Sequence, residues 1–364
     1  MRSLESSTFL KLIIIKKFYY NLTHWETWHY LAKYLPIGPV WLWYALRSRS
    51  IWWFSPSNPT LTFGGFEGEK KKEMYDQLPK EFYPKTIYID PRISLDELLK
   101  IVEKNEFVYP FAVKPNAGMM GFMFRKIYTE QQLNLYHEQI GTEYILQDIA
   151  DYPLEVSVFY YRYPGEEKGF ITGFLKKEYL QVTGDGFKTL EELISEYSRA
   201  DLKMDEILSK NKKQLHTIIR KDQKVILSQA LNLSRGGKMV SLEKEIDEDL
   251  LKVFDGLSNF SKSFYYGRYD IKCKSVEDLK KGREFLILEF NGSGAEPHHI
   301  YGNNNSLFQA YGIVLKHWKV LYKISKINNE SGVKYWSFMD GFKFLRKAKK
   351  HFKKLKQLDG NFEY

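Results

Sequence analysis

The sequence contains a single cysteine, Cys273, among its 364 residues. One cysteine excludes a disulfide within the chain and argues against a zinc site built from cysteine thiolates. Every apolar stretch is interrupted by charges or prolines before it reaches the 18 or so residues that a spanning helix needs, so we expect no transmembrane helix. The sequence shows no internal repeat, no long low-complexity run and no signal-peptide pattern, and we expect a folded protein of a reducing, cytoplasmic setting.

The composition is that of a folded protein that binds something anionic. Hydrophobic residues make up 43% of the chain and charged residues 27%, and the length suffices for one large domain or two ordinary ones. The net charge of +10 is uneven, with clusters at Lys70–Lys72 and from Lys334 to Lys356. Charge alone leaves nucleic acid, anionic lipid and phosphorylated small molecules open as partners.

Both ends of the chain mix aromatic and basic residues. Six of the eight tryptophans lie before residue 54, and prolines interrupt this stretch at Pro36–Pro39 and Pro56–Pro59. The tail from Phe338 to Lys356 predicts a basic amphipathic helix in which Gly341 is the weak point. Two interpretations stay open for each end: contact with an anionic membrane surface, or packing on the rest of the protein.

The central part of the chain predicts an α+β fold built on antiparallel sheets. Capping boxes at Ser94/Glu97 and Thr189/Glu192 each predict the start of a helix. A further helix is expected over Asp247–Leu257. The stretch Val108–Lys114 is expected to end in a strand, and further strands are expected over Ile145–Gln147, Val156–Tyr160 and Leu286–Phe290.

Acidic and amide side chains cluster on two of the expected strands. Residues two apart on a strand share a face, so Arg268 lies beside Asp270, and Glu289 beside Asn291. If the two strands pair antiparallel, two carboxylates and an amide converge next to an arginine. Hard oxygen ligands of this kind suit Mg²⁺ that also holds phosphate oxygens.

A second constellation surrounds Lys114. This lysine ends an expected strand and is followed by a loop that contains Gly118 and Gly121. An ammonium group and free backbone N–H groups can together hold a phosphate. The order of residues differs from that of a Walker loop, in which the lysine follows the glycines.

In this order of motifs the chain resembles the ATP-grasp ligases, in particular D-alanine–D-alanine ligase. The resemblance implies that Lys114 and the Gly118–Gly121 loop hold the ATP phosphates. It also implies an adenine-binding hinge at Gln147, Asp148 and Ile149, ribose contacts from Glu155, and two Mg²⁺ ions on Asp270, Glu289 and Asn291. Arg268 would stabilise charge on the acyl phosphate and the tetrahedral intermediate.

A later stretch is similar to the ATP-grasp domains of cyanophycin synthetase and bifunctional glutathione synthetase. Val182-Thr-Gly-Asp-Gly186 precedes a capped helix, and Asn232-Leu-Ser-Arg-Gly-Gly237 follows an expected strand. The resemblance implies nucleotide contacts from Asn232 and a γ-phosphate contact from Lys177, where those families carry arginine. Over its full extent the resemblance runs from about Phe107 to Tyr301.

The chain departs from D-alanine–D-alanine ligase in three places. The upstream phosphate-binding lysine has no motif here, and Lys80 and Lys85 are the candidates. A full N-terminal substrate domain is not recognisable. The loop after Asn291 is also different, so the acceptor is expected to differ from D-alanine. The candidate substrate residues in that loop are Ser293, Glu296, His298 and His299.

The hypothesis from sequence is therefore a ligase that needs ATP and Mg²⁺ and joins a carboxylate to an amine through an acyl phosphate. A lipid-linked substrate at the inner membrane face is a further hypothesis. The expected organisation is an aromatic segment (1–59), a reduced segment (60–105), the catalytic domain (106–325) and a basic tail (326–364). A kinase acting on a non-carboxylate acceptor and a nucleotide-binding scaffold stay open, whereas nucleic acid is the weakest candidate partner.

Overall fold

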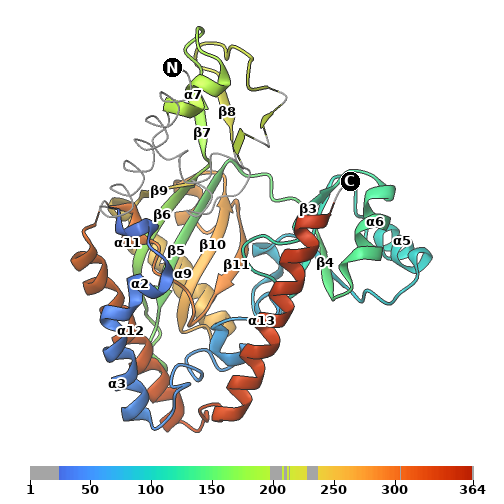
Figure 1. The fold of residues 1–364 in the computed structure, drawn as a ribbon. Coiled ribbons are helices and arrows are strands. Elements are labelled where there is room, and N and C mark those ends of the chain that lie inside the picture. The colour runs from blue at the N-terminus through green and yellow to red at the C-terminus, as the bar shows by residue number, and fades with distance from the viewer. Residues whose placement is uncertain are drawn as a thin grey trace, which may run out of the picture. The chain divides into compact units, whose positions relative to one another are not determined.

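We analysed a computed structural model of the chain, which describes residues 24–196, 207, 208, 211, 212, 214–227, 237–303 and 305–362 (Figure 1). The chain divides into two compact units. The smaller unit comprises Met1–Trp41, Lys177–Val240 and Ile300–Gly312, and the larger comprises Leu42–Lys176, Ser241–His299 and Ile313–Tyr364.

The strands form three sheets. The four-stranded sheet has the order β1 (Thr86–Ile89), β4 (Tyr144–Gln147), β2 (Phe111–Pro115), β3 (Arg125–Ile127). The five-stranded sheet has the order β11 (Phe285–Asn291), β10 (Tyr266–Cys273), β5 (Leu154–Tyr161), β6 (Phe170–Glu178), β9 (Lys238–Ser241). A small sheet pairs β7 (Gln181–Thr183) with β8 (Lys224–Ile226). The pairs β1–β4, β2–β3, β2–β4, β5–β10, β10–β11 and β7–β8 are all antiparallel, so the expected α+β class is confirmed.

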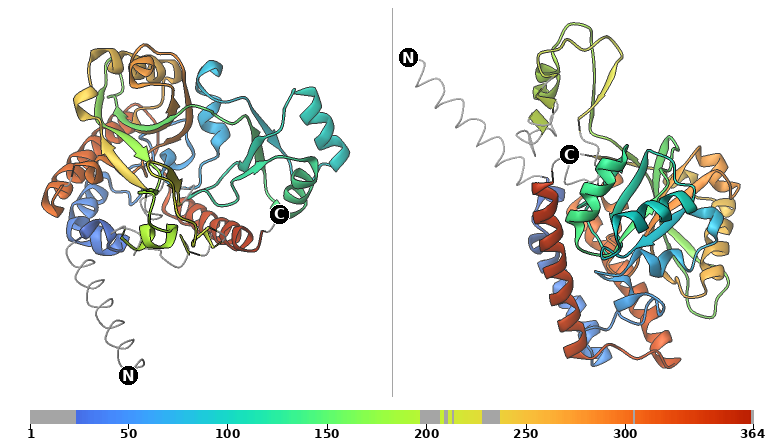
Figure 2. Two further views of the ribbon diagram at one scale, coloured as in Figure 1. Left: turned by 90° about the horizontal axis from the view of Figure 1, so that it is seen from above. Right: turned by 90° about the vertical axis from the view of Figure 1, so that its right-hand side faces the viewer.

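In the larger unit, helices pack on the four-stranded and five-stranded sheets (Figures 1 and 2). The α-helices are α2 (Tyr30–Tyr34), α3 (Gly38–Ser48), α4 (Lys71–Tyr75), α5 (Leu95–Lys104), α6 (Glu130–Ile140), α7 (Leu190–Glu196), α9 (Glu248–Ser261), α10 (Val276–Lys280), α11 (His299–Gly302), α12 (Leu307–Glu330) and α13 (Phe338–Asn361). Short 3₁₀ helices are η1 (Trp25–Thr27), η2 (Leu35–Ile37), η3 (Thr62–Gly65), η4 (Lys80–Phe82) and η7 (Glu243–Glu245).

The capping signals read from the sequence correspond to real helix starts. The Ser94 side chain accepts a hydrogen bond from the Glu97 N–H at the start of α5. At α7 the box is reciprocal: the Glu192 N–H donates to Thr189, and the Thr189 N–H donates to the Glu192 carboxylate. These bonds satisfy N–H groups that the first turn leaves without partners. Both predicted helix starts are confirmed.

The proline in one expected stretch determines where its strand begins. The stretch Val108–Lys114 ends in β2 as expected, and β2 begins at Phe111. Pro110 has no N–H to donate to a neighbouring strand, and Val108 before it is exposed. The sheet therefore begins directly after the proline.

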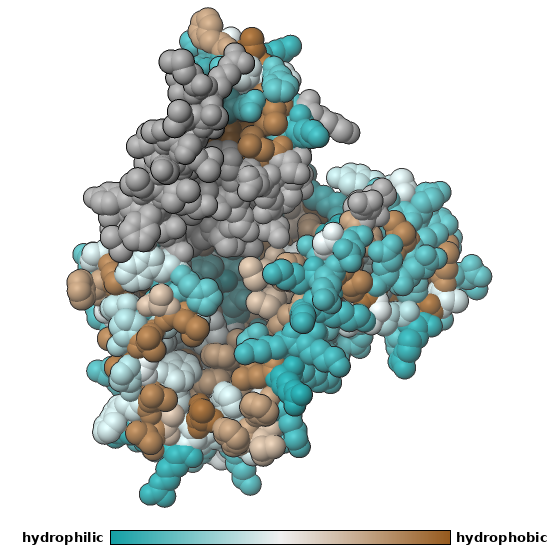
Figure 3. All heavy atoms as spheres, viewed as in Figure 1, coloured by the Kyte–Doolittle hydropathy of each residue, from teal (hydrophilic) through white to brown (hydrophobic). Residues whose placement is uncertain are grey.

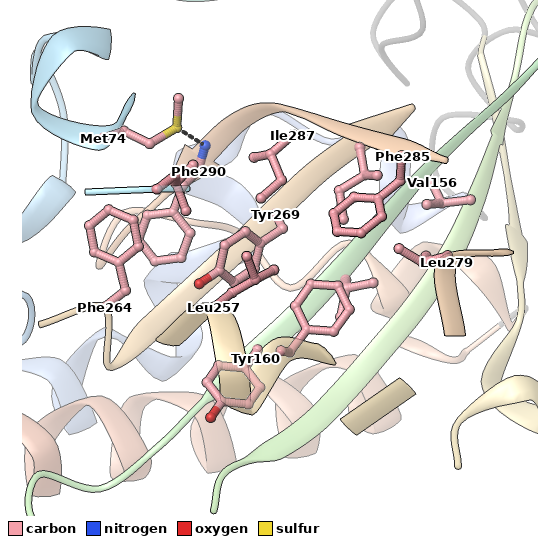
Figure 4. Close-up of a cluster of buried hydrophobic side chains, with 14 of the residues drawn as sticks. Met74, Val156, Tyr160, Leu257, Phe264, Tyr269, Leu279, Phe285, Ile287 and Phe290 are labelled. Carbon is pink, nitrogen blue, oxygen red and sulfur yellow. Dashed lines mark hydrogen bonds between the residues drawn. The ribbon is translucent and has the colours of Figure 1, made fainter. Parts of the chain in front are cut away.

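The core of the larger unit consists of two hydrophobic clusters. The first fills one face of the β10–β11 hairpin with side chains such as Tyr269, Ile287 and Phe290, as Figure 4 shows. The second lies on the four-stranded sheet and contains Leu98, Leu133 and Leu146. Phe352 and Leu355 of α13 belong to this second cluster, so the second half of the tail helix packs on the protein itself.

The tryptophans of the N-terminal segment are divided between core and surface. Trp53 is fully buried and contacts Phe54 and Tyr322, whereas Trp43 is 55% exposed. Packing on the protein is therefore confirmed for Trp53, whereas membrane contact of the exposed Trp43 stays a hypothesis. Across the described residues, no helix has the length and apolar content to cross a membrane.

Asn58 ties the proline-rich turn to the central sheet. Its amide oxygen accepts hydrogen bonds from the N–H groups of Tyr265 and Tyr266, at 2.9 and 3.1 Å. Its amide nitrogen donates to the carbonyls of Gly64 and Tyr266, at 3.0 and 2.9 Å. The side chain is fully buried, so these four bonds have no water to replace them.

We expect Asn58→Ala to lower the free energy of unfolding by about 3 kcal/mol or more, because it leaves several buried backbone groups without partners. Urea denaturation measures the loss. Asn259→Ala is the matched control, since the Asn259 side chain is exposed and makes a single bond to the Glu167 carbonyl. Equal losses in the two variants would contradict the role given to Asn58.

Candidate active site

The β10–β11 hairpin brings the acidic cluster together as its spacing predicts. Asp270 lies opposite Glu289, and Arg268 lies opposite Asn291. The Arg268 guanidinium donates to both oxygens of Asp270, at 3.1 Å each, and the Asn291 amide donates to Asp270 at 3.3 Å. Arg268 and Asp270 are both buried. Burial alone would lower the pKa of Arg268, but the Asp270 carboxylate more than offsets this and the pKa is raised.

The other side of Arg268 faces the loop after β11. Its Nη1 donates to the Glu296 carbonyl at 3.1 Å and lies 3.1 Å from Nε2 of His298. Arg268 is thereby held between the acidic cluster and two of the predicted substrate residues. A guanidinium fixed in this way is a preorganised positive charge.

Lys71 is the residue that sequence analysis missed. Its ammonium lies 2.5 Å from Oε1 of Glu289, and its side chain is only 12% exposed. The flanking Lys70 and Lys72 side chains are each 51% exposed and pair with Glu143 and Asp76 at the surface. In sequence the three lysines look like one solvated run of charge. In the structure only the middle one, Lys71, is largely buried.

Two contacts hold α4 along β11 and so place Lys71. The Phe290 N–H donates to the sulfur of Met74, at 2.7 Å, as the dashed line in Figure 4 shows. The Tyr75 hydroxyl donates to the Leu288 carbonyl, at 2.6 Å. Because Met74 and Tyr75 are buried at the end of α4, Lys71 at its start lies over Glu289.

Lys114 lies in the same electrostatic neighbourhood as Lys71 and Glu289. The backbone connects them: the Lys71 N–H donates to the Asn116 carbonyl at 2.8 Å, two residues after Lys114. Burial and then the positive charge of Lys71 lower the pKa of Lys114 to about 7, against the opposite effect of Glu289. Burial would raise the pKa of Glu289, but Lys71 and Lys114 hold it below its usual range.

The upstream lysines lie in different surroundings. Lys71, not Lys80 or Lys85, lies beside Lys114. Lys85 instead donates to the Glu106 carbonyl at 2.8 Å and lies over the Phe107 ring, while Lys80 is exposed at the start of η4. The Glu289 side chain is 38% exposed, so a ligand can reach this carboxylate.

Glu69 is a second residue that the sequence analysis did not find. Its Oε2 is buried and, among the described residues, makes no hydrogen bond. Burial raises the pKa of Glu69 to about 7, and the nearby Glu289 adds to the effect. A carboxyl group in this state can accept an ammonium group or hold a proton.

The loop after β11 packs on a glycine pair from η3. The Ser293 N–H donates to the Gly64 carbonyl at 3.0 Å, and the Gly294 N–H donates to the Gly65 carbonyl at 3.2 Å. A Cβ on Gly294 would lie 1.9 Å from the Phe66 carbonyl oxygen, so no other residue fits there. Residues 64–69 thus border the same side of the site as the predicted substrate loop.

The loop that holds Gly118 and Gly121 is anchored by α13. The Asp359 carboxylate accepts from the Met123 N–H at 2.9 Å and from Arg125 at 2.8 Å. His351 Nε2 lies 2.8 Å from the Ala117 carbonyl oxygen. Between these anchors Met119 and Met120 are exposed, so the segment predicted to close over a ligand is fixed at both ends and open in the middle.

The predicted hinge joins the two larger sheets. Gln147 ends β4, and Asp148 and Ile149 lead toward β5, which carries Glu155. The Gln147 amide already donates to Tyr75 and Thr86, and the Asp148 N–H donates to the Lys85 carbonyl. The side-chain amide nitrogen of Gln147 and the N–H of Asp148 are therefore already engaged within the protein.

Two of the predicted site residues are not among those placed above. Lys177 is half-buried near the end of β6 and belongs to the smaller unit. Asn232 lies outside the described residues.

His299 is held in an apolar pocket. Its ring lies 5.2 Å from the His317 ring and 6.4 Å from Phe159, and Gly173 leaves the space that it fills. The Tyr266 hydroxyl lies 3.2 Å from Nδ1 of His317. Burial lowers the pKa of His299 to about 4 and that of His317 well below its usual range. These two rings are neutral at pH 7.

The oxygen donors around Glu289 suit a hard divalent cation, although no group of three or more His, Cys, Asp or Glu is placed to bind a metal in the described part of the chain. Asp270, Glu289 and Asn291 offer two carboxylates and one amide on one side of the hairpin. The Lys71 ammonium lies 2.5 Å from one of these oxygens, which shows that the carboxylate accepts a cation at that point.

No protein-family model matches the chain, and no curated protein sequence matches it. Among solved structures, the chain is similar to bifunctional glutathione synthetase from Pasteurella multocida (14% identity, 68% of this chain and 35% of that chain, TM-score 0.39). It is similar to D-alanine–D-alanine ligase from Bacillus anthracis (13% identity, 72% and 69%, TM-score 0.40) and to the ATP-grasp ligase PsnB in complex with a minimal precursor (14%, 69% and 60%, TM-score 0.36).

These neighbours include D-alanine–D-alanine ligase and bifunctional glutathione synthetase, two of the three kinds of ligase whose motifs the sequence resembles. This chain spans about a third of the length of the glutathione synthetase.

The His299 pocket makes stability depend on pH. The unfolded chain protonates His299 below its ordinary pKa, near 6.5, whereas the folded chain resists protonation down to about pH 4. The unfolded state therefore binds more protons in this window, and stability falls as the pH drops from 7 to 5. We expect His299 to contribute about 2 kcal/mol of that fall.

Urea denaturation of wild type and His299→Gln at pH 7 and pH 5 tests this. The variant should lose about 2 kcal/mol less than wild type between the two pH values. His216→Gln is the control, because the His216 side chain is exposed. An equal acid loss in wild type and His299→Gln would show that the ring is protonated in the folded state.

Proposed function

We propose that this protein is an ATP-grasp ligase that joins a carboxylate to an amine and releases ADP and phosphate. The observation that carries the proposal is the convergence of Lys71, Lys114 and Arg268 with Asp270 and Glu289. Three cations close to two carboxylates and an amide suit a polyphosphate that binds together with metal ions. A site for an uncharged ligand would gain nothing from this density of charge.

In this proposal the phosphates lie against Lys71, Lys114 and the Gly118–Gly121 loop. Asp270, Glu289 and Asn291 would hold two Mg²⁺ ions, which neutralise phosphate charge. Lys71 now pairs with Glu289, and we infer that it moves to the phosphate when the cations bind to that carboxylate. Adenine would bind at the hinge Gln147–Ile149 and the ribose at Glu155.

The reaction follows from these positions. A substrate carboxylate oxygen attacks the γ-phosphorus, the bond to ADP breaks, and an acyl phosphate forms. The amine nitrogen then attacks the acyl carbon, the carbon–oxygen bond to phosphate breaks, and the nitrogen loses its proton. Arg268, held by Asp270 and His298, stabilises the negative charge on the intermediate.

We place the acceptor amine beside residues 64–69 and the loop with Ser293, Glu296 and His298. Two buried oxygens on this side, Oε2 of Glu69 and Oγ of Ser293, have no hydrogen-bond partner among the described residues. An ammonium or amine group supplies the donors that such oxygens need. In this proposal the His299 ring lies in its own pocket and supports the loop by packing.

The first test is turnover of Mg-ATP with a panel of amino acids, peptides and membrane-lipid extracts, with hydroxylamine as a trap. We expect ADP and a hydroxamate, because hydroxylamine captures an acyl phosphate. Glu289→Gln should lower the rate at least about 100-fold, since it removes a charge from the phosphate site.

Glu284→Gln, on the same hairpin but paired with Lys274 at the surface, serves as the control and should turn over normally. A stable phosphorylated acceptor without hydroxamate would make the protein a kinase. Tight ATP binding with no turnover on any extract would favour a nucleotide-binding scaffold.

The lysine run offers a second test with its own control. Lys71→Met should lower turnover about 100-fold and raise the KM for ATP, because it removes a cation from the phosphates. Lys72→Met removes the same charge one residue later, from a side chain that pairs with Asp76 at the surface, and should leave both constants unchanged. Steady-state kinetics of the two variants measures both constants. Equal changes in turnover and in the KM for ATP in the two variants would refute the placement of Lys71.

A further inference from the structure

Two helical segments of the larger unit expose apolar side chains in the same pattern. On α3 these side chains are Leu42, Trp43 and Leu46, and at the start of α13 they are Phe338, Met339 and Phe342. Each set occupies positions i, i+1 and i+4, so each covers one helical face. Leu46 is 73% exposed and Phe338 59%, far more than packing side chains retain.

Trp52, which follows α3 in the chain, packs on the start of α13. Its indole N–H donates to the Phe338 carbonyl at 3.2 Å, and its ring stacks on the Phe338 ring with 6.5 Å between centroids. A Cβ on Gly341 would lie 2.4 Å from the Trp52 indole nitrogen. Gly341, a weak point for a helix, therefore permits Trp52 to lie against α13.

The same two segments of the chain are rich in basic side chains. The guanidinium of Arg47 lies over the exposed Trp43 ring, with 6.0 Å from its Cζ to the centroid. Residues 42–54 and 338–350 contain seven basic residues and one acidic residue, Asp340. Figure 3 shows apolar side chains gathered over α3 and the start of α13, and hydrophilic ones along the rest of α13.

We propose that this aromatic–basic surface docks on an anionic lipid bilayer. Indole and phenyl rings insert at the headgroup level, and arginine and lysine beside them attract anionic lipid. The surface fits a bilayer better than a second copy of the chain, because a self-contact would bring two strongly basic faces together. In the described part of the chain no helix is suited to crossing a membrane, which makes this attachment peripheral.

This proposal is independent of the ligase chemistry, since it is read out by lipid binding and not by turnover. The full chain is sedimented with vesicles of phosphatidylcholine alone and with vesicles in which phosphatidylglycerol replaces a quarter of it. We expect binding to the anionic vesicles, at least about tenfold weaker binding to the neutral ones, and a loss of binding as salt screens the charges.

Two double variants test the surface itself. Trp43→Ser with Leu46→Ser, and Phe338→Ser with Phe342→Ser, should each weaken binding to anionic vesicles at least about tenfold, because each removes inserted apolar groups. The control is Val108→Ser with Phe260→Ser, which changes two equally exposed apolar residues elsewhere on the larger unit and should bind as wild type. Thermal unfolding verifies that every variant is folded.

Several results would overturn the proposal. The wild type could fail to bind anionic vesicles at low salt, or the two surface variants could bind as tightly as the control. Equal binding to neutral and anionic vesicles would exclude the role of charge. Concentration-dependent self-association that only the surface variants lose, without vesicle binding, would assign the surface to a second copy of the chain.

Discussion

The ion pair between Lys71 and Glu289 is the constraint on which the arrangement of the site depends. It requires α4 to lie along β11, which the contacts of Met74 and Tyr75 secure. With α4 in this position, the Lys71 N–H donates to the Asn116 carbonyl, and this brings Lys114 into the electrostatic neighbourhood of Lys71. The chain before α4 must then pass the end of β11, which places Glu69 near Glu289 and the Gly64–Gly65 pair on the loop after Asn291.

The part of the site that lies on neighbouring strands was predictable from the sequence. Side chains alternate along a strand, so Arg268 with Asp270 and Glu289 with Asn291 could be assigned to shared faces, and the antiparallel pairing confirms their convergence. Lys71 was not predictable in this way. Its burial comes from a helix packed on a strand more than 200 residues away. Because its neighbours Lys70 and Lys72 are surface residues, the sequence alone gives no sign that Lys71 differs from them.

For the aromatic residues, too, the sequence could not predict which side chains are buried. Trp52 and Trp53 are adjacent in sequence, yet Trp53 is fully buried and Trp52 lies against the start of α13. Composition indicated correctly that these rings are unusual, but only the contacts of Trp53 with Phe54 and Tyr322 assign it to the core. The glycine pair at Gly64–Gly65 is a third case, because its partner strand end at Gly292–Gly294 lies far along the chain.

The helix α13 connects two regions that the sequence treats separately. Its first turn carries Phe338 and Phe342 on the proposed lipid-binding surface, and its last turns carry His351 and Asp359, which hold the loop around Gly118. A helix of 24 residues is about 36 Å long, and its second half is fixed to the four-stranded sheet by Phe352 and Leu355. The proposed lipid-binding surface and the side chains that anchor the loop over the proposed phosphate site therefore lie toward opposite ends of one continuous helix.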